Sequence, residues 1–120
     1  MQLGDFGAEV IKIERPGKGD DARAFAPPYQ GDQSAYFLSV NRNKKSIVLD
    51  LKSERDKEAL WRLIDTSDVL VENFRPGVMD RLGFGYDAVR QRRPELVYAS
   101  ISGFGDTGPG RDRPGYDVII

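Results

Sequence analysis

The sequence predicts an α/β fold, in which a parallel sheet has helices against both of its faces. Four short runs are nearly continuous in apolar and β-branched residues, as expected of buried strands: residues 9–14, 46–51, 68–72 and 96–101. Segments with helical signals separate the last three runs. Because strands that alternate with helices are typical of parallel sheets, we expect loops at the strands' carboxyl ends to form a ligand crevice.

The first predicted strand contains Val10, Ile11 and Ile13 and is stopped by a Pro-Gly turn at residues 15–17. The following segment, residues 18–34, consists mostly of Gly, Asp, Ala, Pro and Gln. Its adjacent prolines lack backbone donors and restrict the residues before them, so we expect a surface loop.

A helix is predicted directly after the second strand. Ser53 and Asp56 have the spacing of a capping box, which opens a helix by satisfying free backbone N–H groups. Apolar residues then recur at helical spacing, at Ala59, Leu60, Leu63 and Ile64. The charged residues between them lie elsewhere on the helix, which is therefore expected to be amphipathic.

The second half of the chain repeats the alternation of strands and helices. A short helix, Val78–Leu82, is predicted after the third strand. A second helix, Tyr86–Arg92, precedes Pro94, which ends it before the fourth strand.

Composition excludes several classes of function. Lys and Arg total 18 against 19 for Asp and Glu, so the net charge of −1 gives no general attraction to nucleic acid or membranes, and any anion site must be local. No apolar run approaches the ~18 residues of a membrane span, and the start lacks signal-peptide features, so we expect a cytoplasmic protein. The chain has no Cys and no His, which excludes thiolate nucleophiles, disulfides and the usual zinc ligands within this segment, and no metal site is predicted.

The junction after the third strand is suited to hold an anion. A phosphate there would meet backbone N–H groups, the Asn73 amide and the guanidinium of Arg75 or Arg81, while Phe74 offers a stacking surface for a planar base. The alternative is that Asn73 forms the turn, Phe74 packs inward and Arg81 is a solvated helix residue. Spacing alone favours that alternative.

Three other features have competing interpretations. Arg15 and Lys52 follow strands, yet on spacing alone they are surface charges. The basic run at residues 41–45 faces either phosphates or solvent. Residues 103–108 fit the G-x-G-x-x-G pattern, but a Pro-rich and Gly-rich segment follows where a dinucleotide-binding fold needs a helix, so we interpret them as a flexible loop beside the crevice.

Residues 72–83 (Glu-Asn-Phe-Arg-Pro-Gly-Val-Met-Asp-Arg-Leu-Gly), together with residues 8–17 and 102–109, resemble the class III CoA-transferase family, also called CaiB/BaiF. The resemblance runs nearly end to end. It implies a Rossmann-like parallel sheet with flanking helices, within the large domain of a longer protein. Residues 1–120 are then expected to be an internal fragment, a partial CoA-binding domain truncated at both ends. The full-length parent is expected to be an interlocked homodimer.

The resemblance also implies which residues contact coenzyme A, and they are Arg15, Leu49, Lys52, Asn73, Phe74, Arg81 and Tyr116. Tyr116 stands where family members that racemise 2-methylacyl-CoA esters carry a histidine base. Because an unperturbed tyrosine has a pKa near 10, it is a poor base at neutral pH, and the position resembles the transferase branch. An aromatic core residue at a helix start is the alternative role of Tyr116.

The activity implied by the resemblance is transfer of CoA from an acyl-CoA thioester to a carboxylic acid, through an aspartyl-CoA intermediate. The nucleophilic aspartate is expected beyond Ile120, so no catalytic residue is predicted here and the fragment alone is expected to be inactive. CoA is a substrate, and no prosthetic group is predicted. The family members that this sequence resembles most move CoA between dicarboxylic acids, as succinate–hydroxymethylglutarate transferases do. The expected donor is therefore succinyl-CoA or another dicarboxylyl-CoA. Formyl-CoA:oxalate and carnitine-type transferases are the alternatives.

Two further classes remain as alternatives. One is a non-catalytic module, or remnant, that binds CoA or another adenine nucleotide. The other, less favoured, is a 2-methylacyl-CoA racemase.

Overall fold

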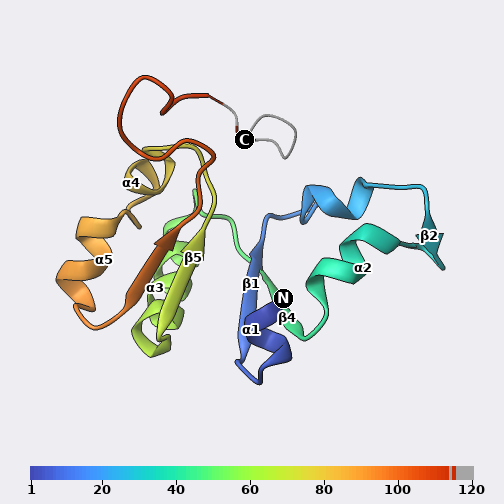
Figure 1. The fold of residues 1–120 in the computed structure, drawn as a ribbon. Helices are drawn as coiled ribbons and strands as arrows, with labels where there is room; N and C mark the ends of the chain where they lie inside the picture. The colour runs from blue at the N-terminus through green and yellow to red at the C-terminus, as the bar shows by residue number, and fades with distance from the viewer. Residues whose placement is uncertain (114, 116–120) are drawn as a thin grey trace. The chain divides into compact units, whose positions relative to one another are not determined.

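The computed structural model describes residues 1–113 and 115, and the chain divides into two compact units, Met1–Lys57 and Glu58–Ile120. Both units combine helices with a pair of parallel strands (Figure 1). This confirms the predicted α/β class and the predicted parallel pairing of strands.

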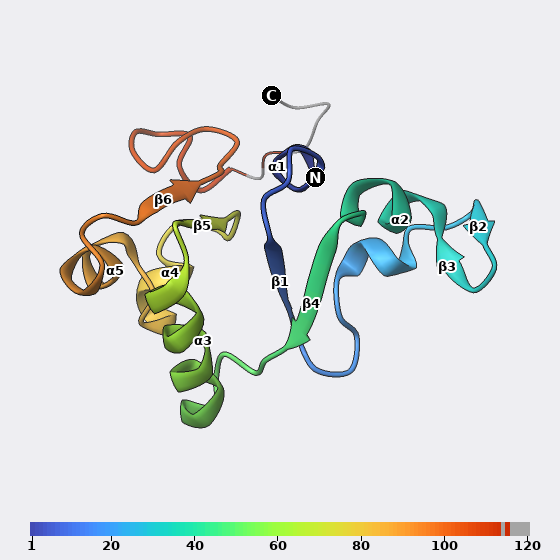
Figure 2. The same ribbon diagram turned by 90° about the horizontal axis from the view of Figure 1, so that it is seen from below.

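The first unit is built on strands β1 (Val10–Glu14) and β4 (Lys44–Val48). They pair in parallel, with Val10 opposite Lys44 and Glu14 opposite Val48, and Figure 2 shows them side by side. The chain between and before them forms smaller elements, which are α1 (Gln2–Asp5), the 3-10 helix η1 (Asp21–Ala24), β2 (Tyr29–Gln30), β3 (Gln33–Ser34) and α2 (Ala35–Asn41).

Two predictions for this unit need correction. Residues 18–34 are not only loop, because Asp20 caps η1 by accepting a hydrogen bond from the Ala22 N–H, and β2 and β3 form an antiparallel hairpin. The second strand was predicted at residues 46–51 but β4 begins two residues earlier and ends at Val48. Its register is set by pairing with β1, a long-range interaction that local composition does not report.

A buried carboxylate ties the elements of the first unit together. Glu14, at the end of β1, is 4% exposed and accepts hydrogen bonds from Arg23 Nε and Nη2, both at 2.8 Å. Ser46 Oγ on β4 donates to the same carboxylate at 2.7 Å, and the Asp20 N–H donates at 2.9 Å. The Arg23 guanidinium also lies 3.9 Å from the ring centroid of Phe37 on α2. The sheet, η1 and α2 are thus joined through the Glu14–Arg23 pair.

The second unit contains α3 (Glu54–Thr66), which begins just before the unit boundary, and then β5 (Val69–Glu72), α4 (Val78–Leu82), α5 (Tyr86–Arg92) and β6 (Val97–Ser100). Strands β5 and β6 pair in parallel from Val69 opposite Val97 to Glu72 opposite Ser100. The predicted bounds of α4 and α5 are confirmed, and the strand bounds are each within one residue.

The core of the second unit lies between its helices and one face of the β5–β6 pair (Figure 2). Its buried residues are Leu60, Ile64, Met79, Phe84 and Val89. The Trp61 and Phe84 rings pack with centroids 5.1 Å apart. The opposite face of the pair exposes Val69, Val71 and Val97, so within this unit the described residues cover one face, not both as predicted.

The predicted capping box of α3 is only partly correct. The helix begins at Glu54 as expected, and the N–H of Lys57 donates to the Ser53 carbonyl at 2.9 Å. The Asp56 carboxylate, however, accepts a hydrogen bond at 2.8 Å from the N–H of Asp50 instead of that of Ser53. The same side chain therefore stabilises the turn that leads from β4 into the helix.

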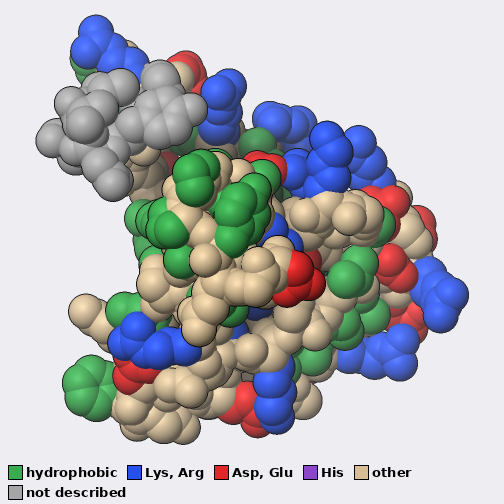
Figure 3. Space-filling view, turned by 90° about the vertical axis from the view of Figure 1, so that its right-hand side faces the viewer, with side chains coloured by type: hydrophobic (Ala, Val, Ile, Leu, Met, Phe, Trp, Pro, Cys, Tyr) green, Lys and Arg blue, Asp and Glu red, His purple; other side chains and the backbone are tan. Residues whose placement is uncertain are grey.

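The surface carries charges of both signs. On the face shown in Figure 3, Lys and Arg side chains lie among Asp and Glu side chains, in keeping with the net charge of −1. Among the described residues, no helix is both long and apolar enough to cross a membrane.

Candidate functional site

In the second unit, the predicted site residues follow the carboxyl end of β5. Phe74 comes two residues after the strand, and its N–H donates to the Glu72 carboxylate at 2.8 Å, which fixes the turn. The Phe74 side chain is 48% exposed, so it is available to stack on a ligand and does not pack inward. Gly77 then caps α4 with φ of 78°, a left-handed conformation that favours glycine.

A pocket with a volume of about 340 Å³ opens at this end of the β5–β6 pair. The residues that line it include Glu72, Phe74, Gly77, Tyr98, Asp106 and Arg111. They come from β5 and β6, the turn before α4 and the loop after β6, and Ser100 at the end of β6 also lines the pocket. The pocket therefore lies at the carboxyl ends of parallel strands, where ligands of α/β proteins usually bind.

The pocket contains a phenol that stays protonated at neutral pH. Burial raises the pKa of Tyr98 to about 12, and the nearby carboxylates Glu72, Asp80 and Asp106 add to the increase because a second negative charge is unfavourable there. The Tyr98 hydroxyl donates to the Phe84 carbonyl at 3.2 Å. Tyr98 is thus a hydrogen-bond donor that braces the pocket wall, not a general base.

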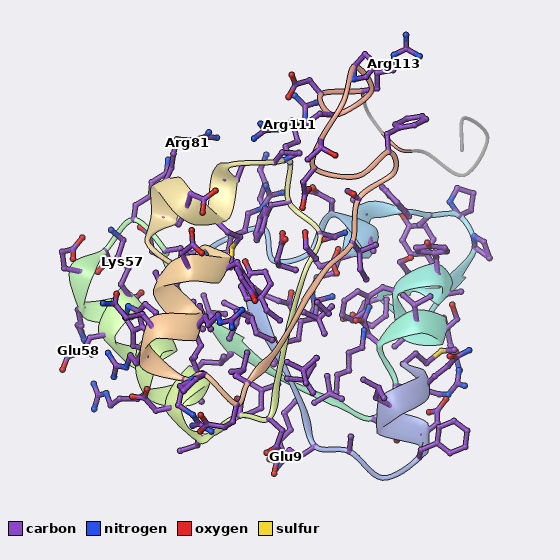
Figure 4. The ribbon with its side chains drawn as sticks, turned by 60° about the vertical axis from the view of Figure 1, so that its left-hand side comes forward. Glu9, Lys57, Glu58, Arg81, Arg111 and Arg113 are labelled. Carbon is purple, nitrogen blue, oxygen red and sulfur yellow. The ribbon has the colours of Figure 1, made fainter. Side chains whose placement is uncertain are left out.

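Arg81 lies on α4 (Figure 4), the helix whose Met79 and Asp80 line this pocket. Its Nη1 would be 3.5 Å from a Cβ placed on Gly77, so the guanidinium reaches back over the turn after β5. Among the described residues, no carboxylate forms an ion pair with Arg81. Asn73 is exposed in the same turn. Asn73, Phe74 and Arg81 thus all lie between the end of β5 and the end of α4, and we call this segment the corner after β5.

In the first unit, Arg15 and Leu49 lie directly beyond the paired ends of β1 and β4. The Leu49 N–H donates to the Glu14 carbonyl at 3.0 Å, and Leu49 is buried. Arg15 is exposed and pairs with Asp21. Lys52 follows in an exposed turn, where its N–H donates to the Asp50 carboxylate at 3.0 Å.

The last predicted contact residue, Tyr116, lies outside the described residues. The described site residues fall into two groups, one in each unit. Arg15, Leu49 and Lys52 follow β1 and β4, whereas Asn73, Phe74 and Arg81 follow β5.

The basic run at residues 41–45 has structural partners in this chain. Arg42 pairs with Asp5 at 2.7 Å, and Lys45 pairs with Glu9. Lys44 Nζ donates to the Asn41 side-chain oxygen at 3.0 Å, and burial lowers the pKa of this lysine. These contacts tie α1 and α2 to β4, so the solvated-face interpretation is incomplete and a phosphate role is not needed to explain the run.

The glycine-rich loop after β6 is held by its own contacts. No helix follows it among residues 103–113, as the rejection of a dinucleotide motif predicted. The Gly105 N–H donates to Ser102 Oγ at 3.0 Å, and a Cβ on Gly110 would lie 3.2 Å from the Phe104 Cβ, which shows how closely the two segments pack. This fold places Arg111 at the pocket, a residue that the sequence reasoning missed. The turn-forming Gly108-Pro109-Gly110 directly before it was the available signal.

Within the described residues, no three carboxylate side chains lie close enough to hold a metal ion. The candidate site consists of guanidinium, amide, aromatic and carboxylate groups.

Comparison with known proteins gives consistent matches along the whole chain. Residues 1–120 match the model of CoA-transferase family III. The acetyl-CoA:oxalate CoA-transferase of Acetobacter aceti is 57% identical over 98% of this chain and 30% of its own length. The human succinyl-CoA:glutarate CoA-transferase is 49% identical over 99% of this chain and 27% of its own.

Solved structures agree with the sequence matches. A crystal structure of a CAIB/BAIF family protein from Brucella suis is 44% identical, with a TM-score of 0.90 over 97% of this chain and 32% of that chain. The protein Rv3272 from Mycobacterium tuberculosis is 49% identical, with a TM-score of 0.86 over 98% of this chain and 32% of that chain. The chain thus spans about 30% of the length of the curated relatives it matches.

Proposed function

Because this chain belongs to CoA-transferase family III, we propose that it forms part of the CoA site of a protein that moves CoA from an acyl-CoA thioester to a carboxylic acid. The observation that carries the proposal is the corner after β5. It presents an exposed Phe74 ring, the Asn73 amide and an Arg81 guanidinium without a carboxylate partner among the described residues. An aromatic face, an amide and a cation suit the adenine and phosphate groups of CoA.

Residues of the first unit are proposed to contact CoA as well. Arg15 offers a guanidinium to a phosphate, and its pair with Asp21 is exposed on both sides, at 54% and 75% of the side chains. Such a surface pair contributes at most about 1 kcal/mol, so an anion displaces it at little cost. Leu49 supplies apolar contact and Lys52 a second cation. Tyr116 is proposed to lie by the thioester.

The proposed donor is succinyl-CoA or another dicarboxylyl-CoA, and the proposed acceptor is a second carboxylic acid. Relatives named for oxalate, glutarate and succinate support this substrate class. The whole protein is proposed to be an interlocked homodimer.

The proposed reaction proceeds by covalent catalysis from an aspartate outside residues 1–120. Its carboxylate oxygen attacks the thioester carbonyl, and the C–S bond breaks. This step releases CoA as a thiolate and forms a mixed anhydride between the aspartate and the acyl group. The thiolate then attacks the aspartyl carbonyl, which releases the first acid as its carboxylate and gives aspartyl-CoA. The acceptor carboxylate then attacks aspartyl-CoA, and the same steps run in reverse. The acceptor leaves as the new CoA thioester, and the aspartate is regenerated. Tight retention of CoA by the corner after β5 would keep the thiolate in place between steps.

An isotope-exchange experiment with the whole protein tests this proposal. The protein is incubated with succinyl-CoA and radiolabelled succinate, without a second acid. Since aspartyl-CoA forms reversibly from succinyl-CoA with release of succinate, we expect label to enter succinyl-CoA. Radiolabelled butyrate serves as a control for the dicarboxylate preference and is expected to exchange poorly.

Other outcomes point to different functions. Hydrolysis of succinyl-CoA without exchange would contradict an aspartyl-CoA intermediate. Binding of CoA with neither exchange nor hydrolysis would indicate a non-catalytic module. Racemisation of a 2-methylacyl-CoA by the same preparation would indicate the racemase branch.

A further inference from the structure

We propose that Arg111 acts together with Arg81 as a pair of guanidinium groups that holds one phosphate group of CoA. The inference deepens the proposed function and rests on it. It concerns a residue outside the set predicted from the sequence, and the loop after β6 brings it to the site.

The two guanidinium groups converge over the backbone of Gly77. A Cβ placed on Gly77 would lie 3.5 Å from Arg81 Nη1 and 4.0 Å from Arg111 Nη2, although the two arginines are 30 positions apart in sequence. Figure 4 shows both side chains at the same end of the second unit. Because glycine has no side chain, the space between the two guanidinium groups is open. Charge-assisted N–H···O bonds of about 2.7–2.9 Å to different oxygens of one phosphate span such a gap.

The loop that carries Arg111 is constrained by contacts of its own. The Arg111 N–H donates to the Gly108 carbonyl at 3.3 Å, and the Arg113 N–H donates to the Gly110 carbonyl at 3.0 Å. Phe104 packs against Gly110, the residue directly before Arg111. The position of Arg111 at the pocket therefore follows from the folding of the loop and does not depend on an ion pair of its side chain.

Neither guanidinium forms an ion pair with Glu72, Asp80 or Asp106, the carboxylates that line the pocket. Glu72 accepts the Phe74 N–H, and the Asp80 carboxylate is directed at Gly85, where its Oδ1 would be 1.9 Å from an added Cβ. Among residues 1–113 and 115, no carboxylate lies within ion-pair distance of Arg81 or Arg111. Two adjacent cations without a counter-ion repel each other, and a bound dianion removes that repulsion.

The proposal is tested by calorimetry on the whole protein, with CoA, with dephospho-CoA, which lacks the 3′-phosphate, and with inorganic pyrophosphate. Arg111→Ala is expected to weaken CoA binding about 10-fold or more, as loss of a charge-assisted hydrogen bond does. Arg111→Lys is expected to recover only part of the affinity, because an ammonium lacks the planar fork of a guanidinium. Arg113→Ala is the matched control, since it removes the same charge from the same loop and is expected to change affinity little.

The three ligands identify the phosphate. If Arg111→Ala weakens CoA binding but leaves dephospho-CoA unchanged, the pair holds the 3′-phosphate. If both ligands weaken equally, it holds the diphosphate. An unchanged unfolding midpoint in Arg111→Ala is expected in either case, because the loop is held by backbone contacts.

Failure of this inference is distinct from failure of the proposed function. Loss of CoA affinity in Arg81→Ala with none in Arg111→Ala would overturn the inference and leave the function standing. If the wild-type protein binds no CoA, the proposed function fails. In that case pyrophosphate binding that depends on Arg111 would still support the guanidinium pair, and pyrophosphate binding that is absent or independent of Arg111 would overturn it.

Discussion

At the scale of single residues, Glu14 is the main electrostatic anchor of the first unit. Its hydrogen bonds from Arg23, and then those from Ser46 and the Asp20 N–H, lower its pKa from the ordinary 4.5 to about 2, although burial alone would raise it. A carboxyl group whose pKa is lower in the folded state stabilises that state when ionised. The contribution is complete above about pH 4.5 and is lost as the pH falls toward 2.

Glu14→Gln is therefore expected to lower the free energy of unfolding by about 3 kcal/mol at pH 7. The amide keeps the shape of the side chain but leaves Arg23 without a charged partner. Urea unfolding of the whole protein at pH 7 and at pH 3 measures the effect. The wild type is expected to lose more stability than the variant between the two pH values, and equal losses would contradict the anchor role.

The CoA contacts proposed after β5 come from family resemblance, while spacing alone favoured ordinary structural roles. The exposed Phe74 ring and the direction of Arg81 now favour a binding role on physical grounds. Arg111 was not predicted because its importance depends on how the loop after β6 folds back. The Gly108-Pro109-Gly110 segment signals a turn before Arg111, but it does not specify that the loop approaches residues about 30 positions earlier.

At the scale of elements, predictions succeeded where a local signal was strong. The short helices α4 and α5 have clear limits in Gly77, Gly83 and Pro94, and their bounds were predicted correctly. By contrast, α2 was not predicted. Its signals were Ser34, whose hydroxyl accepts the Phe37 N–H at 3.2 Å, and the helical spacing of the following apolar residues.

The strand β4 shows how tertiary contacts override composition. Two lysines begin it, which a strand pattern disfavours, yet Lys44 reaches Asn41 and Lys45 pairs with Glu9. Leu49 and Leu51 favoured a longer strand, but residues 49–51 leave the sheet and lead into the turn before α3. That turn is stabilised by the Asp56 carboxylate at the Asp50 N–H.

The junction between α4 and α5 depends on a close approach at Gly85. A Cβ there would lie 1.9 Å from Asp80 Oδ1 and 3.1 Å from the Asp80 Cα, while the backbone φ of −66° is ordinary. Gly85→Ala is thus expected to destabilise the whole protein by about 1–3 kcal/mol through crowding and not through backbone strain. Thermal unfolding followed by circular dichroism measures the change.

A double variant tests whether crowding against Asp80 causes the loss of stability in Gly85→Ala. In Gly85→Ala with Asp80→Ala, much of the crowding is removed, so the two losses of stability should sum to more than the loss in the double variant. Strictly additive losses, or a Gly85→Ala variant as stable as the wild type, would show that the contact is unimportant.

At the scale of the whole molecule, the chain presents CoA-contact candidates from two compact units, each at the carboxyl ends of a parallel strand pair. The family match extends over residues 1–120, and the relatives are about three times longer. Fold class and family were both predictable from the sequence, because apolar strand runs and the Asn-Phe-Arg-Pro-Gly junction are local features.

The central claim is that the corner formed by Asn73, Phe74 and Arg81 binds CoA. The most direct test is the dissociation constant of CoA for the whole protein, measured by calorimetry for the wild type, Arg81→Ala and Arg62→Ala. Arg62 is an exposed arginine on α3 and serves as the control for loss of one positive charge in the same unit. We predict that Arg81→Ala weakens CoA binding about 10-fold or more while Arg62→Ala binds as the wild type does. Equal affinity in all three proteins, or no CoA binding by the wild type, would contradict the claim.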